Sequence, residues 1–309
     1  MSLITTNHNN SQQTATMQTP DFPVPFVKMS GTGNDFILID HRKPLLAPEA
    51  MADFAAQVCR RKFSVGADGL IFIEDLSEDS SEVDFQWKFF NADGSVAEMC
   101  GNGARCAARF AFLQGIAPAQ MRFATLAGII EASVSEKDVA VKMTDPVDLK
   151  MDQRITTGQG KEYTVHSIDT GVPHAVVFVD DIEQTDVRAL GNLIRHHQAF
   201  MPAGTNVNFA QVQGNAIKVR TYERGVEDET LACGTGAAAC AIIAALLDQA
   251  ASPVDIITSG NDQLTIIFDC TEEKKSGQHD GKNVLVTNVF LKGPAHTIYS
   301  GKLDAEALL

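Results

Sequence analysis

Two short segments decide the fold: CGNGARCAARF, which begins at Cys100, and CGTGAAACAII, which begins at Cys233. When the two cysteines are aligned, the Cys, both Gly and two Ala coincide. Each segment follows a strand candidate, FQWKFFN ending at Asn91 and AIKVRTY ending at Tyr222, and each opens an Ala-rich stretch typical of a helix. The pattern indicates an internal repeat of about half the chain.

The repeat extends upstream of both segments. NDFILID at 34–40 matches HAVVFVD at 174–180, since both are strand candidates with an apolar centre and a terminal Asp. Apolar residues at helical spacing follow each strand, and in the first half they predict a helix from Pro48. Gly-containing loops then lead into ADGLIFIE at 67–74 and GTNVNFAQV at 204–212. The two halves therefore share the order and spacing of their predicted elements.

The predicted fold class is α+β, with two pseudo-symmetric domains that arose by duplication, each a mainly antiparallel sheet or barrel wrapped around a central helix. The second central helix, AAACAIIAALL, is apolar nearly all round and therefore requires burial on every side. We expect a disordered tail at 1–23, a first domain at 24–139 and a second at 140–291. A C-terminal strand at 292–303 is expected to complete the first domain.

The polar segments 145–160 and 271–283 are predicted as exposed loops between strands. The acidic balance, a formal net charge of −14 over 309 residues, repels phosphate backbones and argues against a nucleic-acid partner. No apolar run approaches the ~20 residues needed to cross a bilayer, and residues 1–22 lack the basic and apolar parts of an export signal. We therefore expect a cytoplasmic protein with no membrane partner.

The chain has six cysteines, and no pair of them forms a C-x-x-C motif or shows Cys/His spacing typical of zinc, so no metal is predicted. Cys106 and Cys240 lie inside the central helices and are interpreted as packing residues. Cys59 and Cys270 lie in no motif and receive the same interpretation.

The repeated Cys-Gly-x-Gly turn suits proton-transfer chemistry. A Cys at a helix N-terminus is expected to have a lowered pKa, and the glycines leave backbone N–H groups free to bind a carboxylate. A single such Cys is more often a small buried residue, but two copies at equivalent positions favour a functional role. Two opposed thiols, one deprotonated, can remove a proton from one face of a carbon and deliver another to the opposite face, without a cofactor.

Several segments together resemble the diaminopimelate epimerase family: FVKMSGTGNDFILID, FFNADGSVAEMCGNGARC, the ERG at 223–225 and LACGTGAAACA. The resemblance runs from about Phe26 to Leu303. It implies interconversion of L,L- and meso-diaminopimelate, a step toward lysine and, in bacteria, toward peptidoglycan, without pyridoxal phosphate or metal. It also implies a homodimer acting on a small amino-acid substrate, with Cys100 and Cys233 as the two acid/base groups.

The resemblance further implies a set of substrate-binding positions. The backbone cradle for the reacting carboxylate would be Gly101 and Asn102 with Gly234 and Thr235. An arginine can bind the distal carboxylate bidentately, a glutamate can accept from an ammonium group, and asparagines can serve both kinds of partner. The remaining positions are Asn34, Gly69, Asn91, His174, Asn206, Glu223 and Arg224.

These positions also have structural explanations. Asparagine favours turns, which explains Asn34, Asn91 and Asn206 about as well as substrate binding does. The neighbouring Glu223 and Arg224 could form a solvated surface pair. His174 occupies the duplicate of the Asn34 position, where it is either a core histidine or a group that orients Cys233 or the substrate amine.

One departure leaves the substrate open. Many family members have Asn-Pro-His where this chain has Val172-Pro173-His174, and Val172 cannot donate the hydrogen bond of that Asn. A first alternative is therefore a racemase or epimerase of another amino acid on the same fold, although Asn91, Asn206 and Arg224 favour a dicarboxylate. A second alternative is a non-catalytic binding protein or a thiol redox protein. A disulfide between the two motif cysteines is predicted only as an inactive, oxidised form.

Overall fold

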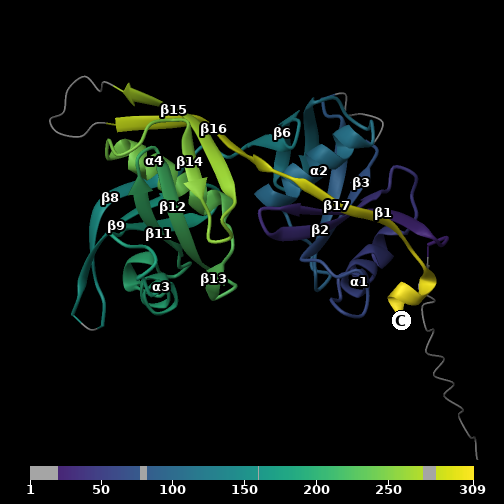
Figure 1. The fold of residues 1–309 in the computed structure, drawn as a ribbon, viewed down its shortest axis with the longest axis horizontal. Helices are drawn as coiled ribbons and strands as arrows, with labels where there is room; N and C mark the ends of the chain where they lie inside the picture. Colours follow the sequence, from purple (N-terminus) through teal and green to yellow (C-terminus); the bar gives the residue numbers. More distant parts are fainter. Residues whose placement is uncertain (1–19, 77–81, 159, 274–282) are drawn as a thin grey trace, which may run out of the picture.

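The computed structural model describes residues 20–76, 82–158, 160–273 and 283–309. The described chain forms two lobes side by side, joined by a continuous path through β16 and β17 (Figure 1). The predicted tail at 1–23 lies outside the described residues except for 20–23.

The first lobe contains the sheet order β17-β1-β2-β3-β4-β5-β6-β7, with α1 and α2 packed on it. Its elements are β1 (Val24–Gly31), β2 (Asn34–Asp40), α1 (Pro48–Val58), β3 (Gly69–Glu74), β4 (Phe85–Asn91), α2 (Gly101–Leu113), β5 (Gln120–Thr125), β6 (Gly128–Ser135), β7 (Asp138–Lys142) and β17 (His296–Leu303). A short 3-10 helix, η2 (Ala305–Leu308), follows β17.

The second lobe repeats this arrangement with the order β8-β9-β10-β11-β12-β14-β15-β16. Its elements are β8 (Val147–Thr156), β9 (Glu162–Asp169), β10 (Pro173–Phe178), α3 (Val187–Arg195), η1 (Gln198–Phe200), β11 (Asn206–Gln213), β12 (Ala216–Glu223), β13 (Asp228–Thr230), α4 (Gly234–Leu246), β14 (Val254–Ile257), β15 (Gln263–Glu273) and β16 (Asn283–Pro294).

The strand pairing confirms the predicted α+β duplication. Among the described strands, the parallel pairs are β2–β3 and β4–β5 in one lobe and β10–β11 and β12–β14 in the other. Each parallel pair is connected through a helix, as a parallel crossover requires: α1 and α2 in the first lobe, α3 and α4 in the second. The remaining described pairs are antiparallel, so both sheets are mainly antiparallel.

Elements with a strong local pattern form where the sequence predicts them. The first predicted strand is β2, Asn34–Asp40, and the helix beginning at Pro48 is α1, whose buried face is Met51, Phe54, Ala55 and Val58. The loop predicted at 145–160 is wrong, because most of it is β8, paired with β9. β8 is exposed at most positions on both faces, so it lacks the alternation that marks a strand. The loop predicted at 271–283 lies partly in β15 and β16 and otherwise outside the described residues.

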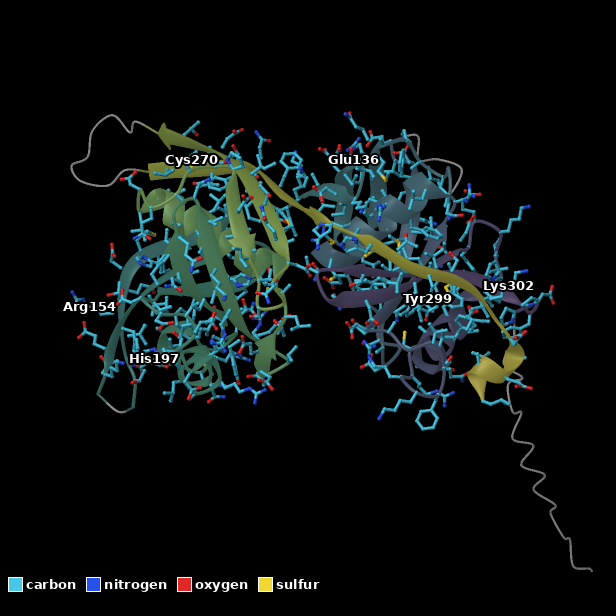
Figure 2. The ribbon with its side chains drawn as sticks, viewed as in Figure 1. Glu136, Arg154, His197, Cys270, Tyr299 and Lys302 are labelled. Carbon is cyan, nitrogen blue, oxygen red and sulfur yellow. The ribbon has the colours of Figure 1, made fainter. Side chains whose placement is uncertain are left out.

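Each central helix is enclosed by its own sheet. α4 contacts β9, β10, β11, β12, β14, β15 and β16, which explains why its sequence is apolar nearly all round. α2 contacts β1, β2, β3, β6, β7 and β16, and it also touches α4 across the junction. Cys106 and Cys240 are fully buried in these helices, as predicted. Cys270 is exposed on β15, away from the junction, so the packing interpretation was wrong there (Figure 2).

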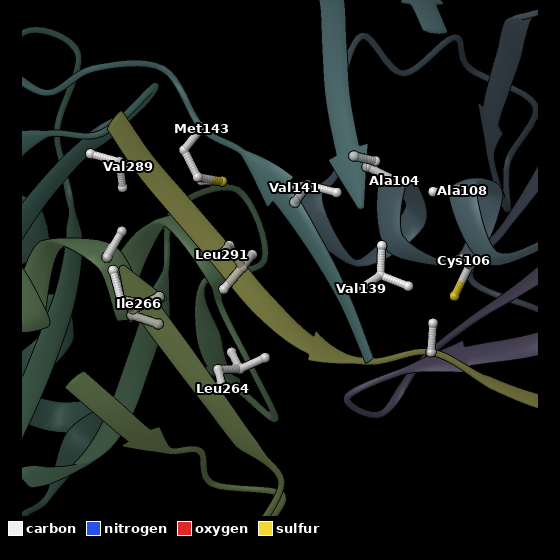
Figure 3. Packing of buried hydrophobic residues seen from close by; sticks show 14 of the residues in the cluster. Ala104, Cys106, Ala108, Val139, Val141, Met143, Leu264, Ile266, Val289 and Leu291 are labelled. Atoms are coloured by element: carbon white, nitrogen blue, oxygen red, sulfur yellow. The ribbon is translucent and has the colours of Figure 1, made fainter. Parts of the chain in front are cut away.

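The two lobes meet where β7 pairs antiparallel with β16, with Val141 opposite Leu291. Apolar residues of both lobes, with Val139 and Ala104 on one side and Leu264 on the other, form one continuous buried cluster across this junction (Figure 3). Because β7 also pairs with β6, we propose that the division between the domains lies after β7, close to the expected boundary, with β17 completing the first domain on β1.

The core of the first lobe yields a stability prediction. The rings of Phe85 and Phe123 stack with centroids 4.8 Å apart, and both side chains are fully buried. Phe123→Ala is expected to lower the free energy of unfolding by about 3–5 kcal/mol, because it removes buried apolar area and leaves a cavity. Phe63, which is 77% exposed, is the matched control, and Phe63→Ala should change stability by less than about 0.5 kcal/mol. Urea unfolding of both variants measures the difference, and similar losses in the two would contradict the packing described.

Candidate active site

The two motif cysteines open on a single cleft at the junction of the lobes. Cys100 is the N-cap residue of α2 and Cys233 that of α4, and both have extended backbone conformations, with φ of −149° and −126°. Both are partly buried, and both line the same cleft of about 820 Å³. The duplicated turns therefore face a common space, each with the N-terminus of its helix directed at it.

One side chain lies against both turns. A Cβ added at Gly101 would come within 3.1 Å of Leu291 Cδ2, and one added at Gly234 within 2.7 Å of the same atom. Leu291 is fully buried in β16, so it has little room to yield. The glycines of the motif are thus required for close packing of the two helix N-termini on a single leucine, as well as for access to their N–H groups.

Asn34 contacts the sulfur of Cys100 and is itself held by Asp68. Cys100 Sγ donates to Asn34 Oδ1 at 3.5 Å, and Asn34 Nδ2 donates to Asp68 Oδ2 at 2.7 Å. Arg61 holds Asp68 in turn, with an Nη2–Oδ1 distance of 2.8 Å. This chain of contacts fixes the amide orientation of Asn34, so that its oxygen faces the cysteine.

Cys233 has different neighbours. Its Sγ lies 3.4 Å from Thr235 Oγ1, and the backbone carbonyl of Thr235 accepts a hydrogen bond from Thr170 Oγ1 at 2.9 Å. Glu223 lines the same cleft, and burial raises the pKa of its carboxyl group. The two cysteines therefore occupy equivalent places in the fold but not equivalent environments.

The electrostatics of the cysteines differ from the sequence-based expectation. Burial raises the pKa of Cys100 above its usual range, although the N–H groups of Asn102 and Gly103 oppose this effect. Burial, followed by the charge of Glu223, raises the pKa of Cys233 to about 11. The helix N-termini do favour the thiolates, as predicted, but desolvation outweighs them. The prediction of lowered pKa values is therefore wrong for this state of the cleft.

The structure brings together eight of the predicted site residues. The cleft is lined by Asn34, Cys100, Gly101, Asn102, Glu223, Cys233, Gly234 and Thr235. Gly69, Asn91, His174, Asn206 and Arg224 do not contribute to its lining.

The residues outside the lining have structural partners. Asn206 Oδ1 accepts from the backbone N–H of Arg224 at 2.9 Å, and Arg224 Nη1 donates to the carbonyl of Ala203 at 3.2 Å. Asn91 Nδ2 donates to Ser95 Oγ at 3.0 Å in an exposed turn. A Cβ added at Gly69 would come within 2.7 Å of the Phe89 ring, which is a packing reason for that glycine.

His174 is fully buried behind the second turn. Asn208 Nδ2 lies 3.0 Å from His174 Nδ1 and can only donate, so the imidazole proton is on Nε2. That Nε2 atom has no hydrogen-bond partner among the described residues. Burial, and then the positive charge of Arg224, lowers the pKa of His174 to about 3. The ring is therefore neutral at physiological pH.

Several charged groups of the cleft are not predicted from the sequence: Asp68, Glu98, Glu229 and Lys142. Asp68 directly precedes the strand that begins at Gly69, and its place beside a predicted site residue was a usable signal. Lys142 ends β7, and nothing in its local sequence marks it, because its proximity to the turns results from the β7–β16 pairing. When Glu223 is counted with these groups, the cleft is lined by more carboxylates than cations. This excess of negative charge favours ammonium groups in a ligand.

No cluster of His, Cys, Asp and Glu suited to a metal ion occurs in the described parts of the chain. None of the helices that the structure describes is long and apolar enough to cross a membrane.

Solved structures show that other proteins share this fold. A phenazine biosynthesis protein of the PhzF family from Bacillus anthracis aligns with a TM-score of 0.67 at 14% identity, over 91% of this chain and 99% of its own. A probable proline racemase from Agrobacterium radiobacter, with bound carbonate, aligns with a TM-score of 0.63 at 16% identity, over 91% of this chain and 93% of its own. At these identities the comparison shows the fold alone: the two-lobed fold that these proteins share.

Sequence comparison identifies the family. The family model described as diaminopimelate epimerase matches residues 26–149 and 166–283. Diaminopimelate epimerase of Aquifex aeolicus is 47% identical over 92% of this chain and 99% of its own length, and that of Archaeoglobus fulgidus is 43% identical over 77% and 87%. The chain belongs to the diaminopimelate epimerase family and is thus an enzyme of the isomerase class.

The packing of both turns on Leu291 can be tested with Gly234→Ala. The added methyl group would displace the turn or the leucine, and a displacement of an ångström near reacting atoms lowers turnover by about 10²-fold. Leu291→Ala introduced into the same chain should restore part of this loss, although it should lower stability by about 2–5 kcal/mol. Steady-state kinetics on the single and double variants measure the coupling.

Gly158→Ala is the matched control, because no atom lies within 4 Å of a Cβ added there. Full turnover in the Gly234→Ala variant would show that the turn does not depend on this contact.

The buried His174 predicts a pH dependence of stability. The unfolded chain takes up a proton at this residue below about pH 6.5, whereas the folded chain does so only near pH 3. The free energy of unfolding should therefore fall as the pH decreases between these values, by about 3 kcal/mol at pH 4 from this group. An NMR titration, with the His174 signal assigned by its loss in His174→Gln, should show no protonation between pH 7 and pH 4. A midpoint near 6 would contradict the burial described.

Proposed function

We propose that the chain interconverts L,L-diaminopimelate and meso-diaminopimelate by transferring protons between Cα and two cysteines, Cys100 and Cys233. The observation that supports this most strongly is the meeting of two Cys-Gly-x-Gly helix N-termini in one cleft. Membership in the diaminopimelate epimerase family supports the choice of substrate.

In the proposed reaction, the thiolate of one cysteine removes the Cα proton, so that a C–H bond breaks and an S–H bond forms. The thiol of the other cysteine then donates its proton to the opposite face of the carbon. The negative charge that develops on the substrate carboxylate is stabilised by the N–H groups at the two helix N-termini. At the end of the turnover the two cysteines have exchanged protonation states. After the product leaves, the new thiol releases its proton to water and the new thiolate takes one up from water, which restores the starting state.

Desolvation is central to this proposal. The Cα proton of an amino acid is very weakly acidic, so a strongly basic thiolate is needed to remove it. The burial that raises the pKa of both cysteines also makes each thiolate a stronger base once it forms. Only one cysteine has to be a thiolate at any time, because the other donates its proton as a thiol.

The acidic residues of the cleft fit the ammonium groups of the substrate, with Glu223 and Asp68 as acceptors. For the distal carboxylate we propose Arg224, whose guanidinium would have to leave the carbonyl of Ala203 and turn into the cleft. We also retain Asn34, Asn91, Asn206 and His174, with the backbone of Gly69, as proposed contributors. In the present geometry Asn34 is the one of these five that lines the cleft.

We place the reaction in lysine biosynthesis and, in a bacterial host, in the supply of peptidoglycan precursors, without a cofactor or metal. A cytoplasmic location and a homodimer are part of the same proposal and rest on the family resemblance. The second candidate, epimerisation of another amino acid, is favoured by one observation: Val172 lines the cleft where many family members have an Asn.

The test is to incubate the reduced protein with L,L-diaminopimelate in D₂O and to follow both Cα deuterium incorporation and the meso isomer. Wild type should catalyse both. Cys100→Ala and Cys233→Ala should each lose on the order of 10²–10⁴-fold in epimerisation, because one of the two proton transfers loses its acid/base group. Cys270→Ala is the matched control, since this cysteine is exposed and outside the cleft.

Absence of deuterium exchange in the wild type would remove diaminopimelate as the substrate. The same assay with proline, histidine and other amino acids would then decide between a relative with different selectivity and a protein that is not an epimerase. Full turnover by protein with a Cys100–Cys233 disulfide would contradict the two-thiol mechanism.

A further inference from the structure

The two central helices differ at one buried position. Arg105 lies in α2 one turn after Cys100, and its side chain is completely buried. When Cys100 is aligned with Cys233, the corresponding residue of α4 is Ala238. A buried arginine in only one of two duplicated helices calls for a local reason, because burial of a charge is strongly unfavourable unless other groups compensate.

Arg105 reaches three segments of the chain around the first turn. Its Nη2 atom donates to Asn102 Oδ1 at 2.9 Å and to Thr32 Oγ1 at 3.0 Å. Longer contacts, both of 3.4 Å, join Nη1 to the carbonyl of Gly101 and Nε to that of Pro294. The guanidinium thus ties the Cys100 turn to the loop after β1 and to the strand segment that crosses between the lobes.

None of these partners is a carboxylate, and no described acidic side chain forms an ion pair with Arg105. The hydrogen bonds satisfy the N–H groups but leave the positive charge without a counter-ion. A thiolate formed at Cys100 would lie close to this charge and would be stabilised by it.

The second turn lacks the whole arrangement. With Asn34 aligned to His174, the counterparts of Thr32, Asn102 and Arg105 are Val172, Thr235 and Ala238. Glu223 opposes a thiolate at both cysteines. At Cys233 its charge is the largest influence after burial, whereas at Cys100 the charge of Arg105 outweighs it. The charges that act on the cysteines are Arg105 from α2 and Glu223 from β12, and Cys106 and Asp262 also face Arg105. The cleft that both cysteines line also contains Asp68, Glu98, Lys142 and Glu229.

We propose that Arg105 is a positioning residue that holds the Cys100 turn against the Thr32 loop and stabilises the thiolate of Cys100, so that Cys100 ionises more readily than Cys233. The inference rests on the proposed two-cysteine function and adds which of the two cysteines ionises more readily. The duplicated fold makes the two cysteines opposed, and the buried guanidinium of Arg105 beside the Cys100 turn makes them unequal.

The test measures the two thiols separately. The reduced protein is alkylated with iodoacetamide over a range of pH, and modification of Cys100 and Cys233 is followed by peptide mass spectrometry. In the wild type, Cys100 should react faster than Cys233 at neutral pH. In Arg105→Met, the midpoint of Cys100 alkylation should rise by at least about one pH unit, a tenfold loss of thiolate, while that of Cys233 stays nearly constant. In Arg105→Lys, which keeps the charge, the midpoint of Cys100 alkylation should lie between those of the wild type and Arg105→Met.

The matched control is Arg109→Met. Arg109 lies one helical turn further along α2 and donates to the carbonyl of Ala295, between β16 and β17. Its replacement therefore also removes a guanidinium that joins α2 to the segment crossing between the lobes. It should lower stability without moving the Cys100 midpoint. In turnover, the acid limb of the kcat/KM profile should shift upward in Arg105→Met by the same amount as the alkylation midpoint, which a purely structural role would not produce.

Faster alkylation of Cys233 than of Cys100 in the wild type would overturn the inference, and so would an unmoved Cys100 midpoint in folded Arg105→Met. If Arg105→Met does not fold, the wild-type ratio and the Arg105→Lys midpoint still decide, because Arg105→Lys keeps the charge and should retain the preference for Cys100. Turnover of diaminopimelate with no Cys100 preference would reject only the role of Arg105. Absence of turnover with any amino acid would reject the proposed function and leave the alkylation result interpretable.

Discussion

The contact on which the rest of the site depends is the packing of two glycine turns against Leu291. This leucine belongs to β16, which pairs with β7 of the other lobe and so crosses the junction. Because Gly101 and Gly234 approach the same Cδ atom, the two helix N-termini are held at a separation set by one buried side chain. The cleft, the opposed cysteines and the accessible N–H groups all follow from this arrangement, and the glycines of the motif are needed for it.

Duplication alone would produce two equal cysteines, but the proposed proton transfer needs one thiolate and one thiol. The two halves of the protein differ in the charged residues near these cysteines. Burial raises the pKa of both cysteines, so neither ionises readily unless a neighbouring charge favours it. Glu223 opposes ionisation of both cysteines, but at Cys100 the charge of Arg105 outweighs it. Of the two residues that make the difference, Arg105 is completely buried and Glu223 lines the cleft.

The residues expected to bind substrate fall into two groups. Those of the two turns line the cleft, because backbone geometry places them there irrespective of side-chain conformation. The asparagines and the arginine beyond the turns depend on side-chain choices, and several of them are engaged in local hydrogen bonds: Asn91 with Ser95, and Asn206 with the backbone of Arg224. A residue pattern can identify such positions but does not reveal which way the side chain points.

The sequence by itself determined the duplication, the central helices, the α1 stripe and the identity of the two cysteines, because each of these is a local pattern repeated at a fixed offset. It did not show β8, whose exposed faces carry no alternation, or the direction of the cysteine pKa shifts, which depends on burial. Only the tertiary structure placed Leu291 between the turns, Lys142 in the cleft and Arg105 without a carboxylate. These features involve segments far apart in the chain, and the β7–β16 pairing that joins the lobes is invisible to any local pattern.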